Sequence, residues 1–310
     1  MKTGRMELDI MKKFLRFWNK PGHAAYLMVA PAVLVVCLFS IFPMIAAFGL
    51  SLFDVSANLS AWEFVGLGNF QEAFADERFI HSWAVTGLFT LFDVPINIGF
   101  SLLVAALVSG VGLRDKILRS CYILPLICSS TVIGIMWKLF LNPNVGWGIY
   151  SLSKLGFPRI AIFSDVDLAV YGIIFISIWR GFGMSAMILV AAMQGISNSL
   201  YEAATLDGAN KWQQFRHVTL PGISSTLWFL LITRIIGSFQ VFDLIYTITN
   251  GGPAHSTETV VSYIYSRAFQ EGSRLGYSTA MSLVLFAVIL LVSVFLYGRM
   301  ILQERKDGGN

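Results

Sequence analysis

The sequence predicts an all-α polytopic membrane protein with six transmembrane helices. Of its 310 residues 56% are hydrophobic and only 13% are charged, and long uncharged intervals separate the charged residues. A soluble domain carries about 25% charged residues, so this chain lacks the charge to cover a soluble surface. Because the apolar runs are continuous and do not alternate with polar residues, they favour helices over a β-barrel.

Six intervals without Lys, Arg, Asp or Glu locate the spans. They are 21–53, 94–113, 120–137, 181–201, 217–233 and 275–298. A transmembrane helix needs about 20 mostly apolar residues, so we expect spans at about 25–52, 84–109, 119–140, 168–194, 220–247 and 276–301. The first apolar run is far longer than that of a cleaved signal peptide, and we expect it to be retained.

The basic residues outside the spans predict the orientation. Fourteen fall on the side that holds both termini, and five fall on the other side. Because connections rich in Lys and Arg face the cytoplasm, we expect a cytoplasmic N-terminal tail at 1–24 and a cytoplasmic C-terminal tail at 303–310. The transmembrane domain then covers 25–302, with outer connections at about 53–83, 141–167 and 248–275.

Enzyme chemistry and nucleic-acid binding are not indicated. The four histidines lie on both sides of the membrane, and no Cys/His spacing of a metal site occurs, so we predict neither catalytic residues nor a metal. No Lys directly follows a Gly, which excludes the usual phosphate-binding loop and therefore ATP hydrolysis by that route. Basic residues do not cluster outside the N-terminal tail, and we expect no nucleic-acid partner.

Five ionisable residues fall inside the expected spans. Asp93, Lys138 and Arg180 are placed toward the outer ends of their helices, where their side chains can reach the interface. Arg234 and Asp243 are deeper in the fifth span and too far apart to pair along one helix. A buried ionisable residue is a functional candidate, but pairing with a neighbouring subunit would explain either one equally well.

The cytoplasmic connection at 195–221 is expected to begin with a short helix. Ser199, followed three residues later by Glu202, is a capping box, and Gly208 can close the helix in the left-handed conformation. The small Ala203 and Ala204 permit close approach to a groove on another protein, where Glu202 and Asp207 supply acceptors. An amphipathic helix resting on lipid headgroups explains the pattern equally well.

A second short helix is expected directly after this glycine. Asn210 with Gln213 can start it, and Trp212 and Phe215 would then lie on its inner face. Pro221 suits the first turn of the next span. We therefore expect two short helices joined by a glycine elbow along the cytoplasmic face.

The whole connection at 195–221 resembles the EAA signature of permease subunits in binding-protein-dependent ABC importers. The resemblance rests on Glu202-Ala203-Ala204, Gly208 and Leu220-Pro221, with Val218 where the family usually has Ile. Segments 64–70, 119–125, 137–143 and 242–257 resemble the carbohydrate-uptake branch, which includes the maltose and glycerol-3-phosphate importer permeases. The similarity extends over nearly the whole chain from about residue 25.

This resemblance implies a type I ABC importer permease fold in the inner membrane of a prokaryote. The chain would translocate a sugar by alternating access and would not itself be an enzyme. The implied partners are a second, similar permease, two ATP-binding cassette subunits, an extracytoplasmic sugar-binding protein and membrane lipid. No cofactor is expected in this chain, since ATP and Mg would be bound by the ATPase subunits. The implied coupling residues are Glu202, Ala203, Ala204, Asp207, Gly208, Ala209, Leu220 and Pro221.

Side chains suited to a sugar are found in several spans. Aromatic faces and planar polar groups bind sugars, and the candidates are Asn97, Trp137, Trp179, Arg180, Gln240, Asp243 and Tyr246. Trp137 and Trp179 also suit an anchoring role at the membrane interface, and the partner permease could hold all of the sugar contacts.

Three other functions are compatible with an apolar chain of this length. An ion-coupled secondary transporter of a small polar solute would use intramembrane carboxylates, for which Asp93 and Asp243 are available. A membrane-embedded enzyme would need clustered His, Asp or Glu at one membrane face, which this chain does not show. A structural subunit without a pathway of its own is hard to separate from a permease half that binds no sugar.

Overall fold

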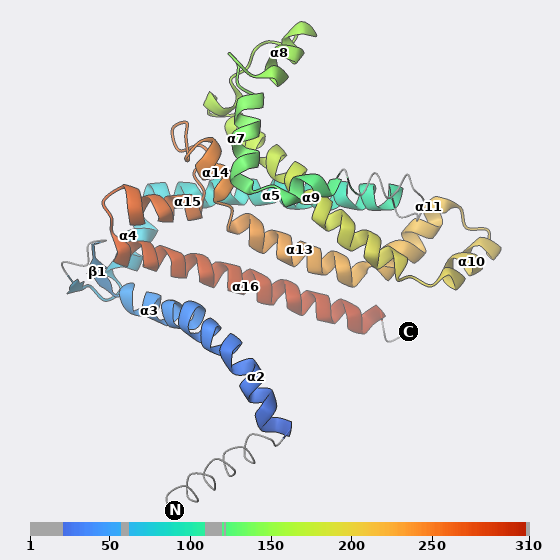
Figure 1. Cartoon of the computed structure of the whole chain (residues 1–310), viewed down its shortest axis with the longest axis horizontal. Helices are drawn as coiled ribbons and strands as arrows, with labels where there is room; N and C mark the ends of the chain where they lie inside the picture. Colours follow the sequence, from blue (N-terminus) through green and yellow to red (C-terminus); the bar gives the residue numbers. More distant parts are fainter. Residues whose placement is uncertain (1–20, 57–61, 109–119, 121, 308–310) are drawn as a thin grey trace, which may run out of the picture.

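Four long helices lie side by side in the computed structural model, which describes residues 21–56, 62–108, 120 and 122–307. They are α5 (Glu77–Leu107), α9 (Ala169–Gln194), α13 (Ser224–Phe239) and α16 (Leu275–Asp307), and together they form the body of the bundle (Figure 1). α5 packs along α9, and α13 packs against α5, α9 and α16. The expected N-terminal tail, up to residue 20, and the connection at 109–119 lie outside the described residues.

Among the described residues, four helices are long and apolar enough to cross a membrane. They are Met28–Leu50, Glu77–Leu107, Ala169–Gln194 and Leu275–Gln303, and a bent pair counts as a fifth if it forms one span. An all-α membrane protein is therefore confirmed. The count of six stays a prediction, because the third and fifth expected spans are broken.

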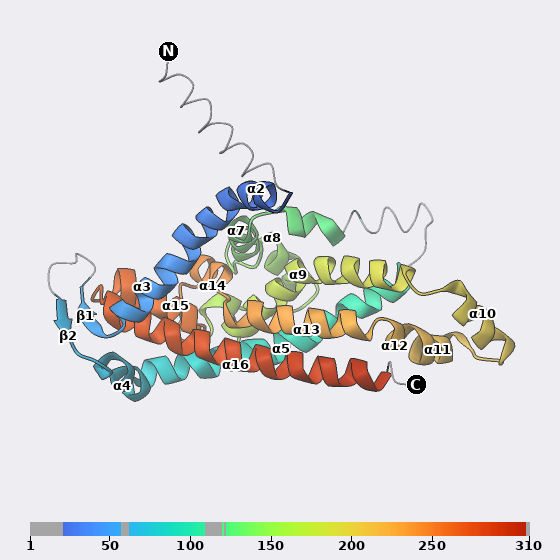
Figure 2. The same cartoon turned by 90° about the horizontal axis from the view of Figure 1, so that it is seen from below.

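The first span agrees with the expected range and lies at the edge of the bundle. It consists of α2 (Pro21–Val36), a π-helical turn η1 (Cys37–Ile41) and α3 (Phe42–Leu50). α3 packs beside α16, and α2 leads away from the other helices (Figures 1 and 2). None of its apolar window is buried within the described chain, so lipid or another chain must cover it.

One end of the bundle carries a small hairpin that the all-α prediction does not contain. Strands β1 (Phe53–Val55) and β2 (Trp62–Phe64) pair antiparallel, and α4 (Gly68–Ala75) follows. The buried Asn69 amide donates to the carbonyls of Ser51 and Phe53, each at 2.9 Å, and so holds α4 against the hairpin. We call this the hairpin end of the bundle.

The second span begins seven residues earlier than expected. Asp76 caps α5, because its carboxylate accepts from the backbone N–H groups of Arg78 and Phe79. The expected start at residue 84 is therefore wrong, and so is the outer connection drawn up to 83.

The third expected span, 119–140, is wrong as one continuous helix. Helical residues 122–127 are separated from α7 (Ser130–Phe140) because Ser129 adopts an extended backbone, with φ −59° and ψ 143°. α7 has 11 residues, too few to cross a membrane alone. It leads to α8 (Trp147–Lys154), which stands away from the four long helices (Figure 1), and then to a short 3-10 turn, η2 (Ile162–Ser164), which packs against α9.

The fifth expected span, 220–247, consists of three pieces. α12 (Leu220–Gly222) is followed by a 66° bend at Ile223, and α13 then ends at Phe239. Residues 240–242 are not helical, and α14 (Asp243–Ile248) starts after them. α15 (Val260–Tyr265) and a π-helical turn η4 (Ser266–Gln270) lead to α16, which continues to Asp307 through most of the expected C-terminal tail.

The other end of the bundle carries the helical elbow. It comprises α10 (Asn198–Leu206), α11 (Lys211–Gln214) and the π-helical turn η3 (Phe215–Thr219). Both views place it at the end opposite the hairpin, toward which the last turns of α16 run (Figures 1 and 2). The fourth span, α9, agrees with its expected range and leads directly into this elbow.

Candidate functional site

A polar pocket of about 260 Å³ lies where α13 gives way to α14. Its polar side chains come from α5, α7, α9, α13, the break and the start of α14, and they include Asp93, Ser130, Ser177, Arg180, Arg234, Gln240 and Asp243. Non-helical backbone at membrane depth occurs where protein buries it or where it lines a water-filled cavity. The break at 240–242 and the pocket therefore belong to one feature, which we call the break pocket.

The break pocket brings together three of the seven candidate sugar residues, namely Arg180, Gln240 and Asp243. The Nε of Arg180 is buried and has no hydrogen-bond partner among the described residues. A guanidinium has five N–H donors and no acceptor, so this side chain keeps a donor for a solute or for water.

The two candidate tryptophans pack against the apolar core formed by α5, α7, α9 and α14. Their ring centroids are 5.3 Å apart in an edge-to-face arrangement, and Trp137 also contacts Phe140 and Phe175. The indole nitrogen of Trp137 is buried with no hydrogen-bond partner in the described part of the chain. Neither ring lines the break pocket, and this packing gives both a role in the core.

Asn97 and Tyr246 also lie outside the break pocket. Asn97 is fully buried; its amide donates to the Ile178 carbonyl at 3.4 Å, and its oxygen accepts from Ser185 at 3.2 Å. It therefore holds α5 to α9. Tyr246 is partly exposed and stacks on Phe242, with Tyr265 completing an aromatic cluster.

An ion pair between Asp93 and Arg234 forms part of the pocket wall. The guanidinium donates to both carboxylate oxygens at 2.7 Å, and Asp93 is only 1% exposed. The prediction that Asp93 lies toward a helix end is wrong, because α5 starts early and Asp93 is the seventeenth of its 31 residues. The partner of Arg234 is thus on another helix of the same chain, and no neighbouring subunit is needed.

The first helix of the elbow begins and ends close to the expected positions, but its cap is different. Ser197 and not Ser199 is the N-cap, since its hydroxyl accepts from the N–H of Ser199 at 3.3 Å; the capping box at Ser199 is wrong. Closure at Gly208 is confirmed: this glycine has φ +82°, and the N–H of Ala209 donates to the Ala204 carbonyl at 2.9 Å.

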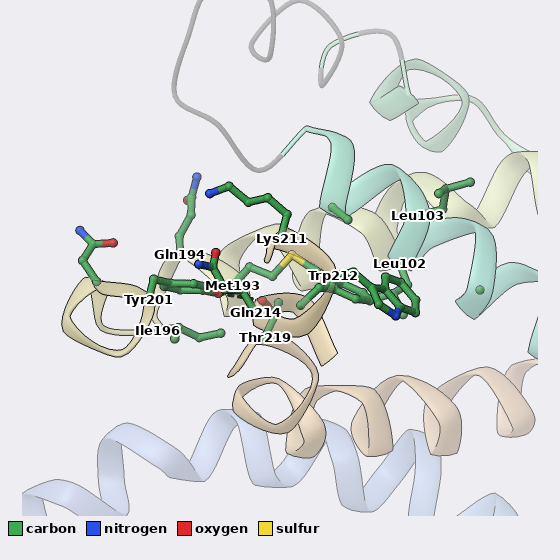
Figure 3. Close-up of a pocket in the computed structure, with 14 residues that line it drawn as sticks. Leu102, Leu103, Met193, Gln194, Ile196, Tyr201, Lys211, Trp212, Gln214 and Thr219 are labelled. Atoms are coloured by element: carbon green, nitrogen blue, oxygen red, sulfur yellow. Dashed lines mark hydrogen bonds between the residues drawn. The ribbon is translucent and has the colours of Figure 1, made fainter. Parts of the chain in front are cut away.

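The second helix of the elbow starts as expected. Asn210 and Gln213 form a capping box, with both hydrogen bonds present. Phe215 packs against the core as predicted, but Trp212 is 66% exposed, so its expected inner-face position is wrong. Trp212 instead stacks on Phe215 beside an apolar groove of about 950 Å³ between the elbow and the ends of α5 and α9 (Figure 3).

Three hydrogen bonds that sequence reasoning missed hold the elbow together. The buried Gln214 donates to the Thr205 hydroxyl at 2.9 Å and to the Ala209 carbonyl at 3.3 Å, and so joins α11 to α10. The hydroxyl of Tyr201 pairs with that of Thr219 at 2.9 Å. All three span a turn and involve ordinary polar residues, so no local motif signals them.

The elbow presents its outer side to the surroundings. Glu202, Ala203, Asp207 and Gly208 are exposed, and Leu206 has 89% of its surface exposed. Ala204, Ala209 and Leu220 are partly buried, and Pro221 is exposed at the start of α12. A braced helix that exposes small, apolar and acidic side chains together is suited to contact with another protein.

Charged and phenolic groups hold the hairpin end together. Arg78 of α5 donates to Glu258 at 2.7 Å and to Glu271 at 2.6 Å, and Tyr263 and Tyr277 both donate to Asp76. Burial raises the pKa of Asp76, but the hydrogen bonds from the two phenols and from the backbone N–H groups of Phe79 and Arg78 together outweigh burial, so this pKa lies below its ordinary value. The hydrogen bond from Arg78 lowers the pKa of Glu271.

These two carboxylates predict a loss of stability in acid. A carboxylate whose pKa is lower in the folded state stabilises that state above its unfolded pKa of about 4, and the effect disappears as pH falls further. We expect the unfolding temperature in detergent to be constant above about pH 5 and to fall below about pH 4. Asp76→Asn should flatten this dependence, whereas replacing the exposed neighbour with Glu77→Gln should leave it unchanged. Identical pH profiles for both variants and the wild type would show that Asp76 does not contribute to the loss of stability in acid.

A bundle of apolar helices around a polar pocket, with an exposed helical elbow at one end, is the architecture of a membrane transport subunit. The chain belongs to the family of binding-protein-dependent transport system inner membrane components, which it matches over residues 97–302. It is therefore a multi-pass inner membrane protein and a permease component, not the ATP-hydrolysing one. The expected resemblance is confirmed, and the alternatives of an ion-coupled carrier and a membrane enzyme are not supported.

Similar proteins include two probable ABC transporter permeases of Bacillus subtilis. YurN is 32% identical over 285 residues, covering 89% of this chain and 95% of its own, and YesP is 32% identical over 294 residues, covering 93% and 94%. The sn-glycerol-3-phosphate transport system permease protein UgpA of Agrobacterium fabrum is 30% identical over 271 residues, covering 87% and 92%.

The fold matches that of a solved permease chain. It comes from a bacterial ABC transporter involved in the import of the acidic polysaccharide alginate, with a TM-score of 0.79 and 25% identity over 96% of this chain and 98% of that one. A structure of the bacterial alginate transporter in complex with an alginate pentasaccharide-bound periplasmic protein matches with a TM-score of 0.79 and 26% identity, over 91% of this chain and 96% of that one.

Proposed function

We propose that this chain is one permease half of an ATP-driven importer that moves a carbohydrate into the cytoplasm by alternating access. The observation that carries the proposal is the break pocket, which Arg180 and the exposed Gln240 and Asp243 line together. A guanidinium, an amide and a carboxylate offer donors and acceptors to the hydroxyls of a sugar. Relatives named for glycerol phosphate and alginate transport support this class of solute.

The elbow would dock onto a separate ATPase subunit. Glu202 and Ala203 are exposed on the braced helix α10, Gly208 is exposed just after it, and the small alanine allows close packing. Movement of the elbow would pass through Leu220 and Pro221 and the bend at Ile223 into α13, whose far end reaches the break pocket. ATP and Mg would be bound by two such ATPase subunits, with no cofactor held in this chain.

A second permease half and a sugar-binding protein would complete the importer. The exposed apolar side of the first span supports a contact with the second permease or with lipid. The elbow and the last turns of α16 lie at one end of the bundle (Figure 2), which supports cytoplasmic termini and tails flanking a domain at 25–302. The binding protein would then deliver sugar at the hairpin end.

The docking role of the elbow can be tested with Glu202→Lys and Gly208→Pro. The first reverses a charge on the exposed face, and the second places a ring where φ is +82°, which proline cannot adopt. We expect both variants to insert at normal yield, to lose sugar uptake by about tenfold or more, and to co-purify with less ATPase subunit. Asp167→Lys, in an outer connection, is the matched control. Normal uptake and normal co-purification by both variants would remove the docking role.

A further inference from the structure

The ion pair between Asp93 and Arg234 joins three helices, and the proposed function assigns no role to this connection. Arg234 projects from α13, and its Nε and Nη2 atoms donate to Asp93 of α5. The same Nη2 contacts the carbonyl and the hydroxyl of Ser177 on α9, at 3.3 and 3.2 Å. One guanidinium thus touches every long helix that lines the break pocket.

The backbone of α9 is shaped to admit this guanidinium. A Cβ placed on Gly181 would lie 2.4 Å from Nη1 of Arg234 and 3.0 Å from Cζ. Gly181 follows Ser177 by four residues, so both face the same side of α9. The side chain of Arg234, which is 22% exposed, therefore passes close over Gly181 on its way to Asp93, and any larger residue at 181 would displace the guanidinium.

The position of Arg234 along α13 connects the two functional regions. α13 follows directly from the elbow after the bend at Ile223, and Ile223 is fully buried. At its other end α13 stops beside the break pocket, which Asp93 and Arg234 both line. Any movement of α13 that follows the elbow must either carry Asp93 along or break two short charge-assisted hydrogen bonds.

We propose that Asp93 and Arg234 form the link that transmits movement of the elbow to the break pocket, with Gly181 positioning the guanidinium. This inference rests on the proposed function. Stability alone is weak ground for keeping such a pair, because apolar replacements of a buried ion pair are often neutral or stabilising. Coupling between distant sites requires an element that can adopt two discrete arrangements and that both sites influence. An ion pair that ties α13 to α5 would make these helices move as such an element.

The test uses the complete importer in proteoliposomes, assembled with its partner permease, ATPase and binding protein. The measured quantity is sugar accumulated per ATP hydrolysed, with a panel of radiolabelled mono- and oligosaccharides as probes. The double variant Asp93→Asn/Arg234→Gln removes both charges at once, so that no unpaired charge is left buried. We expect assembly and ATP hydrolysis to persist while sugar per ATP falls by about tenfold, within the usual range of coupling between sites.

A second variant leaves every charge in place. Gly181→Ala pushes the guanidinium aside and should also lower sugar per ATP, whereas Gly87→Ala is the matched control, because a Cβ there meets nothing within 4 Å. An alanine in a helix is otherwise neutral or stabilising, so Gly181→Ala remains informative if the double variant fails to assemble.

The results distinguish a failure of the proposed link from a failure of the proposed function. Unchanged sugar per ATP in Gly181→Ala, with a lowered unfolding temperature, would show that the ion pair is structural only and overturn the link. A wild-type importer that hydrolyses ATP but accumulates no sugar of the panel would overturn the proposed function and the link with it.

Discussion

Replacing Arg234 alone by methionine is expected to lower the free energy of unfolding by about 3–5 kcal/mol, since removing one partner leaves the other charge buried and uncompensated. The remaining charge would be that of Asp93, which is 1% exposed in the middle of α5. Unfolding of the detergent-solubilised protein by heat or denaturant measures the loss. The control is Arg159→Met, which removes an exposed arginine from an outer connection.

The double variant provides the second comparison for this pair. Asp93→Asn/Arg234→Gln should be less destabilising than Arg234→Met, because no net charge then stays inside the bundle. If Arg234→Met unfolds at the wild-type temperature, or if the double variant is less stable than Arg234→Met, the unpaired carboxylate of Asp93 is not the cause of the loss of stability.

Gly276→Ala is expected to destabilise the hairpin end by about 1–3 kcal/mol, the usual cost of overpacking a filled site. A Cβ at this position would lie 1.9 Å from the carbonyl oxygen of Phe53 and 3.1 Å from the nitrogen of Val55. Both are backbone atoms of β1, so the strand must move away from α16. The unfolding temperature in detergent again measures the effect.

Gly298 on the same helix is the matched control for this substitution. A Cβ there meets nothing within 4 Å, so Gly298→Ala should be neutral or slightly stabilising through the higher helix propensity of alanine. Equal unfolding temperatures for the two variants would mean that β1 does not pack against α16 as the structure places it.

Local signals in the sequence predicted the elbow well. Gly208 closes α10 and Asn210 opens α11, because in both cases the residue satisfies backbone groups within a few positions of itself. The cap of α10 was displaced to Ser197 since two serines, at 197 and 199, compete for the same turn. Such choices depend on small differences in backbone geometry that residue type does not determine.

Contacts between distant helices could not be predicted from one sequence. Asp93 and Arg234 are 141 residues apart, and the error about Asp93 followed from the unrecognised cap at Asp76, which moves the start of α5. The break at 240–242 was also missed, because the apolar run continues through it without Pro or an added charge before Asp243. The helix stops there because of its tertiary environment: polar side chains from other helices surround the non-helical residues.

The π-helical turn η3 (Phe215–Thr219) leads from the elbow into α12 and so toward α13. A π turn holds one more residue than an α turn, and each residue of a regular helix advances the chain by about 100° around its axis. The number of residues in this wide turn therefore sets the direction around the bundle in which α10, the helix proposed to dock onto the ATPase subunit, faces. Shortening it by one would rotate that helix by more than a quarter of a circle while leaving every side chain on it intact.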